Sequence, residues 1–398
     1  MAWPCGILGC RHRWGNRAEP DHRPVIARLV REVVRLGRDR IAGDRSFPRG
    51  IDDLDGSFLG GLLGAPVGGI EVLAATDGTT DRARLALSPG KGVGADQVPA
   101  SVFVKMAPAA AVTRLFVNLT DLGGDEIAFY QQVRPGLDLE APTAHGGTID
   151  AASRRFVLVL EDLEVRGCTF GEVLAPLDVT AAEAVLDTMA TLHASFWRSP
   201  RLDRSGPEGL SWIRANGADP MISLVTMAVR GMGGRLARRD PALAPSGGRA
   251  ILRRYRAVAD ELDAGPHTVL HGDPHPGNCY FVGGRAGLLD WQVVRRGNPL
   301  RDVTYFLVLG LDPADRRRHE QDLLGHYREA LAEAGGPSLT AEAVWADHRK
   351  MAAYPYVAST FTAGLGGLQD EQIGLEGLRR AVAAIEDLDT PACLQSLT

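Results

Sequence analysis

The apolar pattern of this chain changes part-way along it, and this change constrains the fold more than any other feature. From residue 58 to 104, short apolar runs such as GGIEVLAA, RARLALS and ASVFVKM alternate with turns rich in Gly, Asp and Thr. Such alternation is typical of an antiparallel sheet. Beyond residue 163, stretches with helical spacing dominate, at 180–197, 248–263, 313–334, 339–353 and 370–386. This division of 398 residues predicts an α+β fold with two unequal lobes.

Four further segments complete the outline. PVIARLVREVVRLGRDRI predicts a helix near the start, because Val25, Leu29, Val33 and Leu36 recur at helical spacing. We also expect a helix at GDEIAFYQQV, a buried strand at RRFVLVLEDL, and two short strands at NCYFV and AGLLDW. The predicted organisation is a helical extension at 1–50, a β-rich lobe at 51–163 and a helical lobe at 164–398.

Charge and cysteine content exclude several classes of protein. The formal net charge is −5, which gives no global attraction to nucleic acid or to an anionic membrane. No apolar run approaches the ~18 residues that span a bilayer. The five cysteines are scattered and odd in number, which favours a reducing compartment, and we expect a cytoplasmic protein. Cys5 and Cys10 with His12 raise the question of a metal site, but no second ligand pair follows, so free thiols are favoured.

The most informative polar cluster is VLHGDPHPGN, residues 269–278. Asp273 and Asn278 are five residues apart, as in the D-x-x-x-x-N of kinase catalytic loops. Asp290 follows in LLDW, at the end of a second short strand. The oxygens of Asn278 and Asp290 suit Mg²⁺, whereas Asp273 can accept the proton of an attacking hydroxyl.

A nucleotide site also needs a cation for the phosphates. Lys105 is one of only three lysines among 44 basic residues, and it lies on a predicted strand between apolar neighbours. A buried ammonium needs an anionic partner, and Glu126 on the following predicted helix is the candidate. A surface strand lysine is the alternative. Gly78, in TDGTTDRARL, is placed to turn over the phosphates, and backbone groups near Glu161 and Leu163 are expected to meet adenine.

These motifs, together with LATLHASFW, occur in the order seen in a known family. Over roughly residues 58 to 310 the chain resembles aminoglycoside phosphotransferases and choline kinase-like enzymes, most closely the ecdysteroid kinase-like branch. The resemblance implies a protein-kinase-like fold and ATP-dependent phosphorylation of a small-molecule hydroxyl. It implies that Asp273 is the catalytic base, that Asn278 and Asp290 bind Mg²⁺, and that Lys105 and Glu126 orient the phosphates. The chain departs from the family at Gly78, where the Gly-rich loop is thin.

Other polar residues near these motifs have structural interpretations. We expect His271 to bond backbone, His193 to support the catalytic loop, and Asp302 to cap a helix or brace the loop. His275 either touches phosphate or braces the loop. Asp121 and Asp125 are expected to be solvated.

Alternatives to a small-molecule kinase remain. One is a catalytically inactive, kinase-like nucleotide-binding protein, and another is an aminoglycoside- or choline-type kinase. A protein kinase is disfavoured, because H-R-D, D-F-G and A-P-E signatures are missing in these places. The acceptor is expected against residues 210–232 and 351–368, which contain few acids, and this favours a neutral, hydrophobic alcohol. The alternative is that both segments are simply core.

Overall fold

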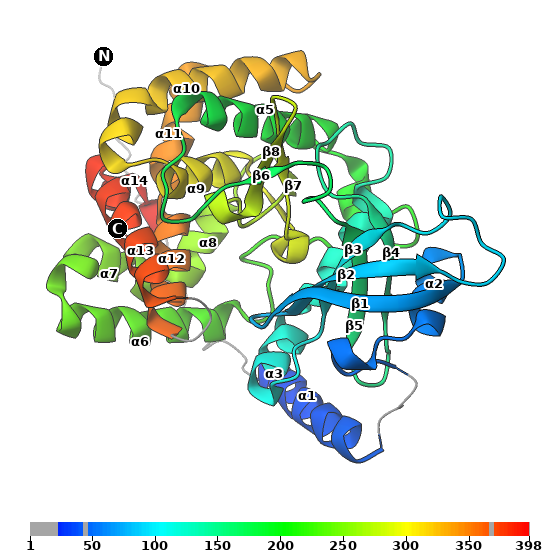
Figure 1. Cartoon of the computed structure of the whole chain (residues 1–398). Helices are drawn as coiled ribbons and strands as arrows, with labels where there is room; N and C mark the ends of the chain where they lie inside the picture. Colours follow the sequence, from blue (N-terminus) through cyan, green and yellow to red (C-terminus); the bar gives the residue numbers. More distant parts are fainter. Residues whose placement is uncertain (1–22, 43–46, 366–369, 398) are drawn as a thin grey trace, which may run out of the picture.

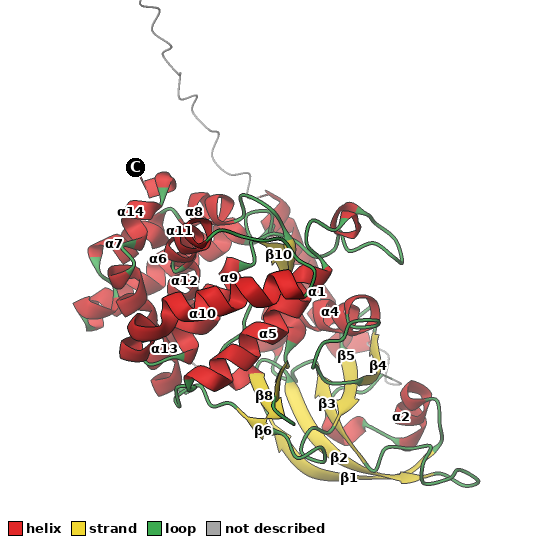
Figure 2. Ribbon diagram, turned by 90° about the horizontal axis from the view of Figure 1, so that it is seen from above, coloured by secondary structure: helices red, strands yellow, loops and turns green. Residues whose placement is uncertain are grey.

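The structure is a computed structural model that describes residues 23–42, 47–365 and 370–397. Cys5, Cys10 and His12 lie outside the described residues. Figure 1 shows a sheet-containing lobe beside a larger helical lobe, and Figure 2 shows the long strands gathered on one side of the helices. The chain therefore has the two-lobed, protein-kinase-like α+β fold that was expected.

The small lobe is built on one five-stranded antiparallel sheet. Its strand order is β1-β2-β3-β5-β4, with β1 at Val67–Thr76, β2 at Asp81–Pro89, β3 at Ser101–Met106, β4 at Ala144–Ile149 and β5 at Phe156–Glu161. The predicted strands are confirmed, and β4 is an addition. Four helices accompany the sheet: α1 at Arg23–Ala42, α2 at Gly56–Leu63, α3 at Ala111–Thr120 and α4 at Leu122–Ala128. The last of these continues as a π-helical turn, Phe129–Val133.

The alternation of side chains along the strands explains the two faces of this sheet. Leu85, Val102, Val104, Val157 and Val159 are buried in one cluster together with Leu59 of α2. Successive side chains of a strand point to opposite faces, so the neighbours of these residues, Lys105 among them, face the other way. One face therefore forms a core with α2, and the other is available to the cleft between the lobes.

The large lobe consists mainly of helices around a second, larger core. Its helices are α5 at Val179–Ser195, α6 at Ile222–Arg239, α7 at Ser246–Arg253, α8 at Tyr255–Leu262, α9 at Leu300–Gly310, α10 at Pro313–Glu333, α11 at Ala341–Met351, α12 at Ala353–Leu365, α13 at Glu371–Asp387 and α14 at Thr390–Cys393. Its short strands are β6 at Thr169–Phe170, β7 at Thr268–Leu270, β8 at Cys279–Val282, β9 at Arg285–Leu288 and β10 at Arg295–Gly297. Strand β7 pairs with β10, and β8 lies between β6 and β9.

Two predicted helix boundaries were wrong. The helix expected at 248–263 is divided into α7 and α8, because the backbone of Arg254 leaves the helical region at φ −112° and ψ 19°. The helix expected at 339–353 ends at Met351, and α12 begins immediately after it with Pro355 in its first turn. Proline is tolerated there because the first N–H groups of a helix have no intrahelical partner. Among the described residues, no helix is both long and apolar enough to cross a bilayer.

Candidate active site

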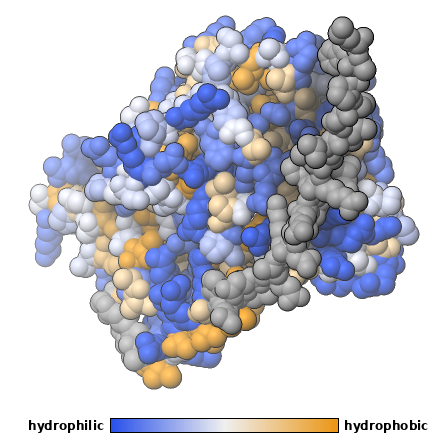
Figure 3. All heavy atoms as spheres, turned by 180° about the vertical axis from the view of Figure 1, so that it is seen from behind, coloured by the Kyte–Doolittle hydropathy of each residue, from blue (hydrophilic) through white to orange (hydrophobic). Residues whose placement is uncertain are grey.

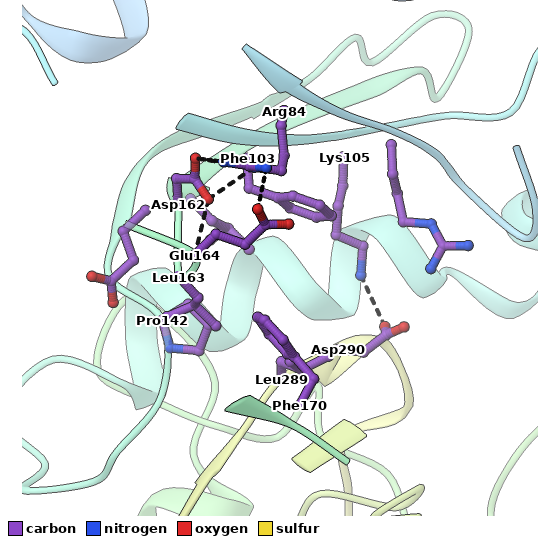
Figure 4. Close-up of a pocket in the computed structure, with 13 residues that line it drawn as sticks. Arg84, Phe103, Lys105, Pro142, Asp162, Leu163, Glu164, Phe170, Leu289 and Asp290 are labelled. Atoms are coloured by element: carbon purple, nitrogen blue, oxygen red, sulfur yellow. Dashed lines mark hydrogen bonds and ion pairs between the residues drawn. The ribbon is translucent and has the colours of Figure 1, made fainter. Parts of the chain in front are cut away.

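A cavity lies between the sheet of the small lobe and Phe170, Leu289 and Asp290 of the large lobe. Its lining combines an apolar part with a charged part, and both are visible in Figure 4. The apolar residues are Phe103, Pro142, Leu160, Leu163, Phe170 and Leu289; the charged residues are Arg82, Arg84, Lys105, Glu161, Asp162, Glu164 and Asp290. A pocket with an apolar part and a few convergent charges is typical of a small-ligand site.

Lys105 lies at the charged end of this cavity. It is only 3% exposed, and its Nζ donates to Glu126 Oε1 at 2.8 Å and to Asp290 Oδ1 at 2.9 Å. Burial alone would lower the pKa of Lys105, but the charges of Asp290 and Glu126 raise it above its usual value. The lysine is therefore a charged ammonium held between two carboxyl groups, and the interpretation of Lys105 as a surface residue is excluded.

The local packing explains how Glu126 reaches Lys105. A Cβ at Gly123 would lie 2.2 Å from the ring of Phe156 on β5, so only glycine lets α4 approach the sheet this closely. Glu126 follows one turn later and is 1% exposed. Its burial raises its pKa to about 7. Lys105, at hydrogen-bond distance, opposes this rise.

Asp290 is held in a strained turn after β9. Its φ of 67° and ψ of 64° are left-handed, a region that non-glycine residues adopt at a cost and that is typical of functional sites. Trp291 fixes the turn, because its ring stacks on Phe129 with centroids 3.8 Å apart and its Nε1 donates to Leu288 O at 3.1 Å. Burial opposes ionisation of Asp290, but Lys105 outweighs it and lowers the pKa of the carboxyl. An ionised carboxylate thus faces the cavity.

The loop after β7 carries Asp273 and is braced by Asp302 of α9. The two oxygens of Asp302 accept from His271 N at 2.6 Å and from Gly272 N at 3.0 Å. His193 Nε2 lies 3.5 Å from Asp302 Oδ2. Although burial favours protonation of Asp302, its contact with His193 and the nearby charge of Arg301 hold the pKa of the carboxyl below the usual range. The predicted supporting roles of Asp302 and His193 are confirmed.

His271 connects the two halves of the site. Its Nε2 lies 3.0 Å from Leu289 O, next to Asp290, and its Nδ1 accepts from Asp273 N at 3.3 Å. These bonds require a neutral ring with the proton on Nε2, and burial lowers the pKa of His271 accordingly. The expectation that His271 bonds backbone is confirmed.

Asn278 is bonded to the same loop. Its Nδ2 donates to the backbone oxygen of Asp273 at 2.9 Å, and the backbone oxygen of Asn278 accepts from Leu289 N at 3.0 Å. Because the side-chain nitrogen is used in the first bond, the amide oxygen is the atom that can bind a cation. His275, by contrast, lies with Nε2 3.8 Å from Asp273 Oδ2, too far for a direct hydrogen bond.

Two tyrosine residues also contact this loop: Tyr305, which was not predicted, and Tyr354, in the expected acceptor segment 351–368. Tyr305 of α9 is 5% exposed, and its hydroxyl donates to Asp273 Oδ1 at 2.5 Å. The hydroxyl of Tyr354, on α12, donates to Gly272 O at 2.8 Å. Tyr305 lies three residues after Asp302, nearly one helical turn, and this spacing is the only sequence signal that points to it.

The remaining sequence-predicted residues divide into two groups. Glu161 and Leu163 line the cavity, whereas Gly78 is not among its lining residues. Gly78 lies beside Arg82, whose guanidinium is 2.9 Å from the position of a Cβ on Gly78. Arg82 lies opposite Lys105 in the register of strands β2 and β3, and it lines the same cavity. Arg84, two residues on, donates to Asp162, directly after β5, at 2.9 Å. In the sequence, arginine alternates with apolar residues from Arg82 to Leu85, and this pattern could have indicated that both arginines lie on the cavity side of the strand.

One expectation about the charges beside Glu126 was wrong. Asp125 is buried, not solvated, and its carboxylate lies 3.0 Å from Arg295 on β10. Burial raises the pKa of Asp125 to about 7. The helix α4 faces the large lobe here, so tertiary packing removed a side chain from water that sequence alone placed on a helix surface.

A sequence model described as "Phosphotransferase enzyme family" matches residues 101–354. The chain belongs to this family. No curated protein matches its sequence.

Several solved structures resemble this phosphotransferase-family chain at low identity. A putative aminoglycoside phosphotransferase from Ralstonia eutropha has 14% identity and a TM-score of 0.45, over 82% of this chain and 93% of that one. A choline kinase from Streptococcus pneumoniae has 14% identity and a TM-score of 0.46, over 83% and 97%. A macrolide 2′-phosphotransferase from Brachybacterium faecium has 17% identity and a TM-score of 0.43, over 81% and 95%.

The matched segment of this phosphotransferase-family member begins on β3 and ends at Tyr354. It includes Lys105, Glu126, Asp273, Asn278 and Asp290, which the geometry brings to one end of the cavity or to the loop beside it. Gly78 precedes the matched segment.

Proposed function

We propose that this member of the phosphotransferase family transfers the γ-phosphoryl group of ATP, with Mg²⁺, to a hydroxyl group of a small molecule. The observation that carries the proposal is the position of Lys105 between Glu126 and Asp290 at 2.8 and 2.9 Å, beside a loop that presents Asp273. The small lobe, 51–163, would hold the nucleotide, and the large lobe, 164–398, would supply the loop and the acceptor site.

The cavity has the two parts that ATP requires. The slot bounded by Phe103, Leu160 and Leu289 suits adenine, and Glu161 and Leu163 line its edge, where we propose that their backbone groups bond the ring. Lys105 would then pair with the α- and β-phosphates, in the role that a strand lysine has in kinases. Arg82, at the same end, would add positive charge where the Gly-rich loop is thin.

Asn278 and Asp290 have the donor atoms that suit Mg²⁺, since it prefers oxygen ligands and usually keeps few protein ligands besides phosphates and water. The described part of the chain contains no cluster of three or more His, Cys, Asp or Glu side chains that could hold a metal. Asn278 and Asp290 would therefore hold the ion together with the phosphates of the nucleotide. When bound, Mg²⁺ neutralises phosphate charge that Lys105 alone cannot balance.

Asp273 is the proposed general base. Its Oδ1 is engaged by Tyr305, which leaves Oδ2 to accept the proton of the acceptor hydroxyl as its oxygen attacks the γ-phosphorus. Asp302 and His271 hold the loop through backbone bonds, so the carboxylate is positioned before the acceptor arrives. Such positioning contributes much of the rate in phosphoryl transfer.

The pairing of nearby acids favours a neutral acceptor. Asp219, in the first expected acceptor segment, lies 3.6 Å from Arg295, and Asp263 lies 3.1 Å from Arg301. The guanidinium of Arg301 also lies 5.0 Å from the ring centre of Tyr354, in the second segment. A polycationic acceptor needs unpaired carboxylates when it is desolvated. We therefore propose a lipophilic alcohol as the acceptor.

The test is a transfer assay with Mg-ATP and a panel of lipophilic alcohols, aminoglycosides and choline, with phosphorylated products detected by mass spectrometry. We expect products from lipophilic alcohols and none from kanamycin-like compounds. Phosphorylation of an aminoglycoside or choline alone would contradict the proposed acceptor. Mg-ATP binding without transfer to any compound would instead favour an inactive nucleotide-binding protein.

A further inference from the structure

Helix α1 is docked on the small lobe by its charged side. It packs against α3, and its two acids, Glu32 and Asp39, are 3% and 5% exposed. Amphipathic helices normally bury their apolar side. In α1 this arrangement is inverted. The spacing of its apolar residues predicted the helix, but it does not indicate which side of the helix is docked.

Ion pairs fix this orientation. Asp39 lies 2.8 Å from Arg114 of α3 and 3.0 Å from Arg155, which precedes β5. Glu32 pairs with Arg35 at 2.6 Å within the helix. Asp39 also lies 3.9 Å from Arg49. A buried carboxylate without its partners is costly, and rotation of α1 about its axis would break these pairs of Asp39. These ion pairs therefore keep the opposite side of α1 facing solvent.

The opposite side of α1 is an apolar stripe in contact with solvent. Its exposed residues are Ile26, Leu29, Val30, Val33, Val34 and Ile41. The first five recur at intervals of three and four residues and so share one side of the helix. Figure 3 shows a band of apolar surface along the lower edge of the molecule, at the place of α1. Contiguous exposed apolar surface of this kind marks interaction sites.

The charges around the stripe indicate what covers it. Helix α1 contains six arginines and two acids, a formal charge of +4, although the whole chain carries −5. Both acids face inward and are paired, whereas Arg31, Arg38 and Arg40 are exposed. The outward side therefore presents apolar and basic groups together. Two copies of this side would bring arginines together with no exposed acid of α1 to pair them.

We propose that α1 binds the surface of an anionic membrane, with its apolar stripe in the boundary between headgroups and acyl chains. Basic amphipathic helices bind membranes in this way, through buried apolar area and attraction to anionic lipid. Each arginine near such a surface adds to the binding. The net charge of the chain gave no reason to expect a membrane partner. Salt screens charges that lie more than a Debye length from the lipid, so attraction of α1 to the membrane depends on the charge of α1 itself.

The test is co-sedimentation of the full chain with phosphatidylcholine vesicles, with and without phosphatidylglycerol. We expect binding that requires phosphatidylglycerol and weakens with salt. The stripe variant Ile26→Ser/Val30→Ser/Val33→Ser should bind about tenfold more weakly or worse, and Arg31→Gln/Arg38→Gln should lose on the order of tenfold. The matched control Leu224→Ser/Met227→Ser, at exposed apolar residues of α6, should bind normally.

Three results would overturn the proposal. The first is no binding to phosphatidylglycerol vesicles. The second is a dimer in solution that the stripe variant converts to a monomer, which would make a second copy the partner. The third is a marked loss of thermal stability in the stripe variant without vesicles, which would mean that another part of the chain covers the stripe. The unchanged melting temperature that we expect also shows that weaker vesicle binding is not caused by unfolding.

Discussion

The hydroxyl of Tyr305 donates to Oδ1 of Asp273 over 2.5 Å. Tyr305 belongs to α9, the helix that also supplies Asp302 to the backbone of the same loop. Burial, followed by the charge of Asp273, raises the pKa of Tyr305 well above its usual value, so the phenol keeps its proton. One helix thus braces the loop and orients its carboxylate.

Tyr305→Phe should lower kcat by about tenfold or more, because hydrogen bonds to charged groups contribute roughly 1.5–3 kcal/mol. The KM for ATP should stay near the wild-type value, because Tyr305 is not among the residues that line the cavity. Tyr356→Phe is the matched control on α12, since Tyr356 is also buried. Equal kinetics for both variants would remove Tyr305 from this positioning role.

Conservative substitutions of Lys105 and Asp290 should abolish binding of Mg-ATP. Lys105→Arg should abolish stabilisation by Mg-ATP in a thermal-shift assay, because a planar guanidinium does not fit between carboxylates that hold a compact ammonium. Asp290→Asn should do the same by removing the negative charge, and asparagine tolerates the left-handed backbone at this position.

Lys91→Arg provides the control, because Lys91 is exposed in the loop after β2. It should respond to Mg-ATP as the wild type does, and removal of Mg²⁺ with a chelator should abolish the wild-type shift. If both site variants retain a normal shift, the nucleotide binds elsewhere.

Protonation of His271 should destabilise the fold. Burial holds its folded-state pKa below the ordinary 6.5, so below pH 6.5 the unfolded chain binds a proton that the folded chain excludes. The free energy of unfolding should therefore be fully maintained above pH 6.5 and fall below it, by at most about 1.4 kcal/mol per pH unit for this group. Urea unfolding of wild type and His271→Gln isolates this contribution, because His348 also has a lowered pKa. If the free energy of unfolding falls equally steeply below pH 6.5 in wild type and His271→Gln, a lowered pKa of His271 would be contradicted.

Gly272 is required by both its backbone and its neighbours. Its φ is 88°, and a Cβ would lie 2.0 Å from Val293 O. Gly265 has a φ of 103° but no atom within 4 Å of its Cβ position, so Gly265→Ala measures backbone strain alone. Gly272→Ala should be more destabilising than this control by roughly 1–3 kcal/mol, the usual cost of overpacking. Equal losses in chemical denaturation would mean that the loop yields to the added methyl group.

The parts of the site that sequence predicted are those encoded by local patterns. Asp273 and Asn278 lie in one loop, Asp290 follows two short strands later, and the rarity of lysine pointed to Lys105. Contacts such as Tyr305 with Asp273, Arg84 with Asp162, and Asp125 with Arg295 join segments far apart in the chain, and only packing brings them together.

The two lobes were predictable for a similar reason, because strand and helix periodicities are local. Periodicity did not predict how helix α1 is oriented. The spacing of Val25, Leu29 and Val33 indicates an amphipathic helix but does not say which side is docked, and ion pairs with Asp39 decide that here.

Substitution of Asp273 tests the central claim most directly. Asp273→Asn keeps the size of the side chain and can accept the bond from Tyr305, but it cannot take a proton from the acceptor. With the best acceptor from the panel, the account predicts that single-turnover transfer from Mg-ATP falls by about 10²–10⁴-fold, while the thermal shift with Mg-ATP stays at the wild-type value. Near-normal transfer by Asp273→Asn would contradict the account.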